Sequence, residues 1–135
     1  MKPVLALWSL ALAAPLAFAA DVTLTDAQID PAFAKADRNK NGTVSLAEAR
    51  RFGLTGKAFR LANPDKDGSL DKAEFAAAVT AQFTAANPDN DGTLDWREAQ
   101  KAGIKSKKVF SAANPDNDGT LDLAEFLAAL SAQAR

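Results

Sequence analysis

The sequence predicts an all-α fold in which four closely spaced helix–loop–helix units form two pairs within one compact helical domain. The first observation is a twelve-residue pattern that occurs four times, at residues 37–48, 63–74, 87–98 and 114–125. The second is an apolar residue at position 8 of every copy, which suits a short β-bridge between paired loops. The third is a phenylalanine four residues before each copy, which with further apolar residues one turn apart gives the flanking segments the stripe of amphipathic helices.

The repeated pattern has the spacing of a loop that binds a hard cation. Such a cation needs about six to eight oxygen ligands, and a twelve-residue loop supplies them from positions 1, 3, 5, 7, 9 and 12, with a glycine at position 6 for the sharp turn. This is the spacing of an EF-hand loop. The expected metal ligands are Asp37, Asn39, Asn41, Thr43, Ser45, Glu48, Asn63, Asp65, Asp67, Ser69, Asp71, Glu74, Asn87, Asp89, Asp91, Thr93, Asp95, Glu98, Asn114, Asp116, Asp118, Thr120, Asp122 and Glu125.

The distribution of carboxylates supports this interpretation. Fourteen of the 17 Asp and Glu residues lie inside the four loops, and none lies outside a loop beyond Asp30. A merely solvated acidic surface would scatter carboxylates over helix faces as well. The chain also has no Cys and no His, so any metal must be held by oxygen ligands, which favours Ca²⁺. Without these residues the sequence offers no nucleophile–base pair, and we expect no enzyme activity.

The chain divides into a leader and two EF-hand pairs. Lys2, an apolar run over 4–14 and an Ala-x-Ala site ending at Ala19 predict a signal peptide at residues 1–19, and hence a periplasmic or secreted protein without a stable membrane anchor after cleavage. A lead segment (20–32) precedes pair 1 (33–82, loops 37–48 and 63–74) and pair 2 (83–135, loops 87–98 and 114–125). The pairs read as a duplication, because the segments after corresponding loops are similar.

Local signals place the helices around the loops. Position 9 of each loop is Ser or Asp and is followed three residues later by Glu, which predicts that every loop ends in a capping box. Gly53 and Gly103 are expected at helix C-termini, whereas residues 75–86 contain no Gly or Pro and predict one continuous helix between the pairs. The connectors are short, at 14, 12 and 15 residues, so the hands are expected to be compact.

Three of the loops share one chemical type. Loops 63–74, 87–98 and 114–125 begin with Asn-Pro and carry four carboxylates each. Asn at position 1 keeps an oxygen ligand but removes a negative charge, and the number of charges is one of the factors that set metal affinity. Pro at position 2 is expected to end the entering helix near this ligand. Loop 37–48 has no Pro, and Asn39, Asn41 and Ser45 stand where carboxylates are common, so it is expected to be the weakest site.

These residues also resemble a narrower family. Asn114-Pro-Asp-Asn-Asp-Gly-Thr-Leu-Asp122, the segment Ala81-Gln-Phe-Thr-Ala-Ala86 and the short connectors are similar to lanmodulin, a family of bacterial periplasmic proteins with four EF-hands. The resemblance covers most of residues 33–130 and implies binding of lanthanide ions (Ln³⁺). The family's tight loops have Asp at position 1, where this chain has Asn63, Asn87 and Asn114.

Three functions follow, and they differ in ligand or partner. The first is a periplasmic Ca²⁺-binding protein that acts as a buffer, carrier or modest sensor, and the second is a lanthanide-binding chaperone. The third is a calmodulin-like sensor that docks a periplasmic protein partner, which the absence of any Met except Met1 disfavours. The cluster Lys101, Lys105, Lys107 and Lys108 fits an acidic partner or, more simply, a solvated connector that balances loop carboxylates. No nucleic-acid partner is expected.

Overall fold

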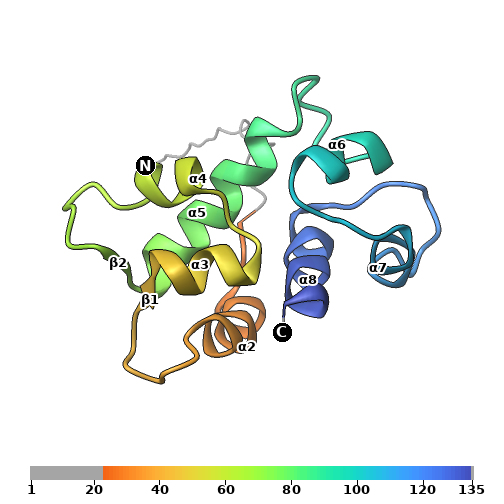
Figure 1. Cartoon of the computed structure of the whole chain (residues 1–135). Helices are drawn as coiled ribbons and strands as arrows, with labels where there is room; N and C mark the ends of the chain where they lie inside the picture. Colours follow the sequence, from red (N-terminus) through yellow and green to blue (C-terminus); the bar gives the residue numbers. More distant parts are fainter. Residues whose placement is uncertain (1–22, 135) are drawn as a thin grey trace, which may run out of the picture.

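The computed structural model describes residues 23–134, and the predicted signal peptide lies outside these residues. The described chain is mostly helical and contains one small sheet (Figure 1). Its elements, in order, are α2 (Asp26–Ala36), β1 (Val44–Ser45), α3 (Leu46–Phe52), α4 (Gly56–Leu61), β2 (Ser69–Leu70), α5 (Lys72–Ala85), α6 (Trp96–Lys101), α7 (Lys107–Ala112) and α8 (Leu123–Gln133). None of these helices combines the length and apolar character needed to cross a membrane.

A capping box starts the helix that leaves each loop, as the sequence predicts. In α5, the Asp71 side chain accepts a hydrogen bond from the backbone N–H of Glu74, while the Glu74 side chain accepts one from the N–H of Asp71. This arrangement satisfies two N–H groups that the first helical turn leaves without partners. The same reciprocal pair starts α3, α6 and α8: Ser45 with Glu48, Asp95 with Glu98, and Asp122 with Glu125.

The helix ends also follow from local sequence. Gly53 caps α3 in the left-handed region with φ of 119°, and Gly103 just after α6 has φ of 107°. Residues with a side chain adopt this conformation only at a cost in free energy, so glycine is favoured there. α5 runs without a break from Lys72 to Ala85, so one helix joins the second loop to the third. This helix therefore crosses the boundary between residues 82 and 83 at which the sequence was divided into pair 1 and pair 2. The first helix, α2, begins at Asp26, within the segment assigned as a lead.

Short β contacts join the loops two by two. Val44 pairs with Leu70 and Ser45 with Ser69 in the antiparallel sheet β1–β2, which places loops 37–48 and 63–74 side by side. Loops 87–98 and 114–125 meet in a single antiparallel bridge, where Leu94 and Leu121 exchange two N–H···O bonds of 2.8 Å. All of these contacts involve position 7, 8 or 9 of a loop, and the position-8 side chains are fully buried.

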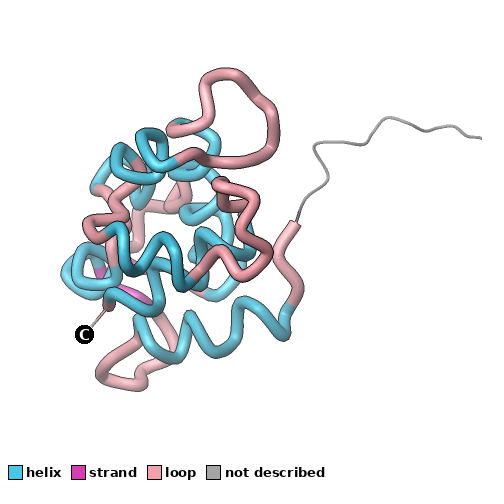
Figure 2. Tube along the Cα trace, turned by 90° about the vertical axis from the view of Figure 1, so that its right-hand side faces the viewer, coloured by secondary structure: helices cyan, strands magenta, loops and turns pink. Residues whose placement is uncertain are grey.

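One hydrophobic core runs through both halves of the chain. Phe75 packs edge-on against Phe33 and Phe52, with ring centroids 5.5 and 5.2 Å apart, and Phe83 contacts Phe126 at 5.8 Å. Helix α8 lies in the middle and contacts α2, α3 and α5 as well as α7 (Figure 1). The helices gather at the centre, and the loops project from them (Figure 2). Each loop is therefore fixed at its ends and open to solvent at its tip.

Candidate metal-binding loops

The first residue of every loop is buried, whereas the loop tip is exposed. Asp37, Asn63, Asn87 and Asn114 are between 5% and 7% exposed, although polar side chains of this kind are mostly solvent-facing in proteins. A buried polar group needs partners, and these side chains point at other loop residues rather than at the core. Position 1 is thus the inner end of each candidate site.

Backbone conformation curls each loop around that point. Glycine at position 6 has φ between 82° and 88° in all four loops, as the sequence predicts. Position 4 is also left-handed, at Lys40, Lys66, Asn90 and Asn117 with φ of 55° to 60°, which the sequence analysis missed. The available signal was Asn at two of these positions, because Asn tolerates the left-handed region better than most residues.

Hydrogen bonds from the backbone to side chains two residues away hold the acidic residues of the loops in place. In loop 63–74, Asp65 Oδ1 accepts from the N–H of Asp67 at 3.3 Å, and Asp67 Oδ1 accepts from the N–H of Ser69 at 3.0 Å. The same bonds recur at positions 3, 5 and 7 of loops 87–98 and 114–125, and in loop 37–48 the amide oxygens of Asn39 and Asn41 accept them in place of carboxylates. In the three Asn-Pro loops each bond uses Oδ1, the carboxylate oxygen that also faces the amide at position 1. These hydrogen bonds therefore orient the carboxylates even when no cation is bound.

The predicted ligands at positions 1, 3, 5 and 7 converge in the three Asn-Pro loops. With its nitrogen turned inward, the Asn63 amide donates to Asp65 Oδ1 at 2.7 Å, Asp67 Oδ1 at 3.0 Å and the Ser69 carbonyl at 3.2 Å. Asn87 and Asn114 make the corresponding contacts in their loops, at 2.6 to 3.1 Å. One amide group thus faces three oxygens in each loop, and these oxygens belong to the expected ligand set.

This donor set fits a hard cation. The carboxylates of Asp65, Asp67 and Glu74 each offer an oxygen within 4.8 Å of the others. Two oxygens bound to one Ca²⁺ at 2.3–2.6 Å lie at most about 5 Å apart, so the spacing suits this ion. The set contains carboxylate, amide and carbonyl oxygens only, which is the ligand chemistry of Ca²⁺. Within residues 23–134, Glu98 and Glu125 do not complete a comparable group of three carboxylates.

Loop 37–48 satisfies its carboxylates with its own backbone. Asp37 accepts hydrogen bonds from the N–H groups of Asn41 at 3.2 Å and Gly42 at 2.8 Å. Glu48 accepts from Ser45 at 2.9 Å and also reaches across the loop to the N–H of Asn39 at 3.2 Å. Burial raises the pKa of Glu48, but these backbone donors outweigh it and leave the pKa below its ordinary value. The glutamate is therefore stable as a carboxylate within the loop.

Glu125, the equivalent residue of the last loop, has the opposite environment. Burial raises the pKa of Glu125, and the nearby carboxylates of Asp122, Asp116 and Asp118 raise it further, although the N–H of Asp122 works against them. The negative charge of Glu125 is thus poorly compensated by the protein itself. A bound cation would supply the missing compensation, whereas loop 37–48 has less need of one.

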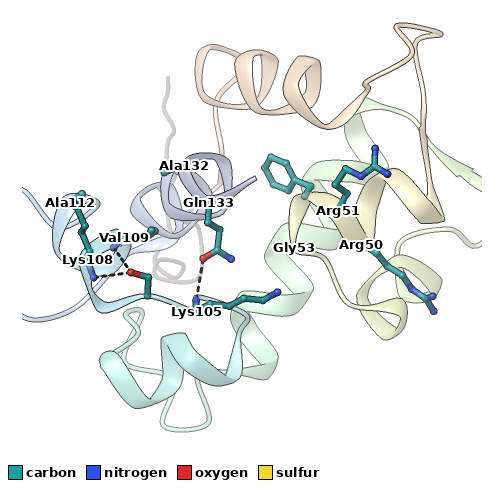
Figure 3. A pocket seen from close by; sticks show the side chains of 11 residues that line it. Arg50, Arg51, Gly53, Lys105, Lys108, Val109, Ala112, Ala132 and Gln133 are labelled. Atoms are coloured by element: carbon teal, nitrogen blue, oxygen red, sulfur yellow. Dashed lines mark hydrogen bonds between the residues drawn. The ribbon is translucent and has the colours of Figure 1, made fainter. Parts of the chain in front are cut away.

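A basic groove lies away from the loops, between the two halves of the chain. It has a volume of about 470 Å³ and is lined by Arg50 and Arg51 of α3 and by Lys105 and Lys108 near α7, over an apolar floor that includes Phe52 and Val109. Figure 3 shows Lys105 reaching toward the α3 wall. Within the described residues, Lys72 and Asp30 form an ion pair at 2.8 Å. None of the groove cations in this part of the chain is paired directly with a loop carboxylate.

Comparison with known proteins identifies one of these loops directly. The EF-hand family profile matches residues 29–52, which comprise most of α2, loop 37–48 and α3. The chain therefore contains an EF-hand over these residues. No curated protein matches the sequence.

Among solved structures, a homolog of programmed cell death 6 protein from Leishmania major Friedlin is similar to this chain at 16% identity and a TM-score of 0.36. The match covers 68% of this chain and 64%, less than two thirds, of that protein.

Proposed function

We propose that the chain is a periplasmic protein with four EF-hands in two pairs, which binds Ca²⁺ as a buffer, carrier or modest sensor. The observation that carries this proposal is the convergence of positions 1, 3, 5 and 7 on one point in each Asn-Pro loop, with Glu74 closing the group in loop 63–74. The signal-peptide pattern at residues 1–19 supports the location. Since the sequence has no His or Cys, we propose binding rather than catalysis.

The residues at positions 1, 3, 5, 7, 9 and 12 of the three Asn-Pro loops would hold the ions. A bound Ca²⁺ would neutralise the four carboxylates that each of these loops carries and fix the loop against the helix that follows. Position 9 has a second task, because its side chain caps that helix. Loop 37–48 would bind more weakly, since the backbone already satisfies Asp37 and Glu48.

The identity of the ion follows from charge. Neutral Asn at position 1 lowers the negative charge of three loops, and charge count is one of the factors that set affinity in these sites. A trivalent lanthanide gains more from each added carboxylate than a divalent ion does, because the Coulomb energy scales with the product of the charges. Asn63, Asn87 and Asn114 therefore favour Ca²⁺, and the lanthanide-chaperone function is the alternative.

A competition titration distinguishes the two ions. Helix content is followed by circular dichroism while Ca²⁺ and, in a separate experiment, La³⁺ is added to the chelator-treated protein. We expect the change to be half-complete at or below about 10⁻³ M Ca²⁺, the weak end of the dissociation constants of extracellular modules. A response to La³⁺ below micromolar concentration, with none to Ca²⁺ until several millimolar, would instead establish the lanthanide function.

The basic groove favours a second function, that of a sensor that docks an acidic protein segment. Four cations from two halves of the chain surround an apolar floor, and none of them is paired with a carboxylate in the described structure. An acidic segment with apolar side chains complements both features. The groove is lined by 11 residues, whereas each side of a standard protein interface contributes about 20–30, so this docking would be weak and transient.

A charge-reversal pair tests the docking function. Lys105→Glu with Lys108→Glu changes the groove, whereas Lys101→Glu with Lys107→Glu makes the same change in net charge at residues that do not line it. Binding of a fluorescein-labelled peptide of alternating Glu and Leu is measured by anisotropy in Ca²⁺. We expect the first variant to lose about tenfold in affinity and the second to stay near wild type. If both variants lose the same affinity for the peptide, net charge alone explains the loss, and a partner specific to the groove is excluded.

A further inference from the structure

Gln82 is a buried polar side chain that belongs to none of the four loops. It lies in the last turns of α5 and is 5% exposed. Its Oε1 accepts a hydrogen bond from the N–H of Thr55 at 2.8 Å, and its Nε2 donates to the carbonyls of Gly53 at 2.9 Å and Ala102 at 2.5 Å. Both ends of the amide therefore bond to backbone groups; the bond to Ala102 is buried, and those with Thr55 and Gly53 are part-buried.

The three backbone partners come from different halves of the chain. Gly53 and Thr55 belong to the connector between α3 and α4, which joins loops 37–48 and 63–74. Ala102 ends α6, in the connector between loops 87–98 and 114–125. The two connectors touch at this point, because a Cβ placed on Gly103 would lie 3.3 Å from both the Gly53 carbonyl and Gln82 Nε2. Gln82 therefore ties the connector of one pair to that of the other.

Gln133 occupies the corresponding place in the second half but makes a different set of bonds. Its Nε2 donates to the Gly103 carbonyl at 2.6 Å, and its Oε1 accepts from the N–H of Lys105 at 3.1 Å (Figure 3). Both partners lie in its own connector. The duplicated position thus supplies a natural control, in which a glutamine clasps one connector without hydrogen bonding to the other.

The element that carries Gln82 also joins the pairs. Helix α5 begins directly after Asp71 of loop 63–74 and ends two residues before Asn87 of loop 87–98. A rotation of α5 driven by Glu74 at the start of the helix would displace Gln82 from Ala102. Leaving a buried amide and carbonyl without partners costs free energy, so the connectors are expected to move together or not at all.

We propose that Gln82 couples the two loop pairs, so that filling loop 63–74 raises the affinity of loop 87–98 and the reverse. The coupling rests on the proposed metal-binding function and specifies its regulation. It requires one shared arrangement of the two connectors that both pairs favour when metal is bound, which is what linkage between two sites demands. Gln82 is the residue that transmits the preference, since it hydrogen bonds to both connectors at once.

Trp96 makes this coupling measurable. It lies inside loop 87–98, so exciting it sensitises the emission of Tb³⁺ bound in that loop and reports on pair 2 alone. Glu74→Gln removes a ligand from pair 1. Four proteins complete a cycle: wild type, Glu74→Gln, Gln82→Met and the double variant, with Met chosen because it keeps the volume of Gln. A Glu98→Gln variant, which removes a ligand of loop 87–98, assigns the emission to that loop, and Trp96→Phe verifies that Trp96 is the donor.

We expect Glu74→Gln to weaken Tb³⁺ binding at loop 87–98 by about fivefold or more in the wild-type background, within the usual range for coupled sites. In the Gln82→Met background the same change should have less than a twofold effect. Gln133→Ala should leave the effect of Glu74→Gln in place, even where it lowers the melting temperature. Circular dichroism of each variant verifies that the helices are retained.

Each failure has its own meaning. If Glu74→Gln affects loop 87–98 equally with and without Gln82, or has no effect in wild type, the coupling is overturned while the metal site stands. If Gln133→Ala abolishes the effect as fully as Gln82→Met does, the assignment to Gln82 is overturned. If wild type gives no sensitised Tb³⁺ emission, the proposed function fails at this loop and the coupling fails with it.

Discussion

The asparagines at position 1 put an amide where a calcium loop commonly has a carboxylate. An amide has a donor end and an acceptor end, so it can turn its nitrogen toward Asp65 and Asp67 in the absence of metal and its oxygen toward a cation when one is bound. A carboxylate at this place would repel its neighbours in the metal-free loop. The neutral side chain therefore stabilises the empty loop and lowers the charge available to the ion.

A single substitution separates these two effects. Asn114→Asp should raise Ca²⁺ affinity at loop 114–125 by about fivefold or more, because charge count tunes such sites, and should destabilise the metal-free protein by about 1 kcal/mol through repulsion with Asp116 and Asp118. Calorimetry and thermal unfolding in chelator measure the two changes. Gln100→Glu makes the same amide-to-carboxylate change at an exposed residue of α6, outside the loops, and should do neither. Parallel behaviour of the two variants would contradict the role given to position 1.

Two glutamates at position 12 should respond oppositely to neutralisation in the metal-free protein. The lowered pKa of Glu48 means that its charge stabilises the fold above the unfolded pKa and that this contribution is lost as the pH falls through the lower folded pKa. The raised pKa of Glu125 has the reverse sign: its stabilising contribution is present at low pH and is lost as the pH rises through the folded pKa.

At pH 7 in chelator, Glu48→Gln should therefore cost about 1 kcal/mol of unfolding free energy. Glu125→Gln should leave the unfolding free energy unchanged or raise it. Gln can keep the capping bond in both variants, so capping does not confuse the comparison. Chemical denaturation at pH 7 and near pH 4 measures the difference, which should shrink at the lower pH. Equal destabilisation by both changes at pH 7 would contradict the environments described for these residues.

At the scale of elements, much of the arrangement was predictable because it depends on neighbours in the sequence. The four capping boxes, the break at Gly53 and the unbroken α5 follow from residues within one or two helical turns. The contacts of Gln82 were not predictable, since Gly53 and Ala102 lie 29 and 20 residues away along the chain. The basic groove was not predictable for the same reason. The sequence shows Lys105 and Lys108 as part of a cluster, but only the fold brings Arg50 and Arg51 beside them.

The connector between α3 and α4 offers a direct test of an element boundary. Gly53→Ala should destabilise the protein by about 1–3 kcal/mol, because φ of 119° is unfavourable for a side chain and the new Cβ would lie 2.9 Å from Leu130 Cδ2. Gly56→Ala, three residues further, meets only ordinary contacts at 3.5 Å and lies at the start of α4, so it should be neutral or stabilising. Equal melting temperatures for the two variants would show that the boundary has been misassigned.

The whole molecule shares one core, although its sequence consists of two similar units. Phe83 from the end of α5 packs on Phe126 of α8, and α8 also contacts α2 and α3 of the first unit. Neither unit can therefore bury its apolar face alone. The duplication predicts two pairs of loops from the sequence, but the packing between the pairs depends on contacts far apart in the chain and had to come from the structure.

This shared core predicts that the chain unfolds as one cooperative unit. Far-ultraviolet circular dichroism reports on all helices, and Trp96 fluorescence reports on the second unit, where the ring contacts Phe110 at 5.5 Å. The two signals should give coincident denaturation midpoints both in chelator and in Ca²⁺, with a higher midpoint in Ca²⁺ because the ion binds only the folded loops. A helical signal that persists after the Trp96 transition would mean that the units unfold separately.

We propose that the three Asn-Pro loops bind a hard cation through converging oxygens, with the glutamate at position 12 among the ligands. The decisive measurement is a calorimetric titration of the metal-free protein with Ca²⁺, using wild type and the variants Glu74→Gln, Glu98→Gln and Glu125→Gln. We predict three comparable equivalents for wild type, with any fourth from loop 37–48 much weaker, and one equivalent fewer in each variant. An unchanged stoichiometry in all three variants, or no heat of binding at millimolar Ca²⁺, would contradict it.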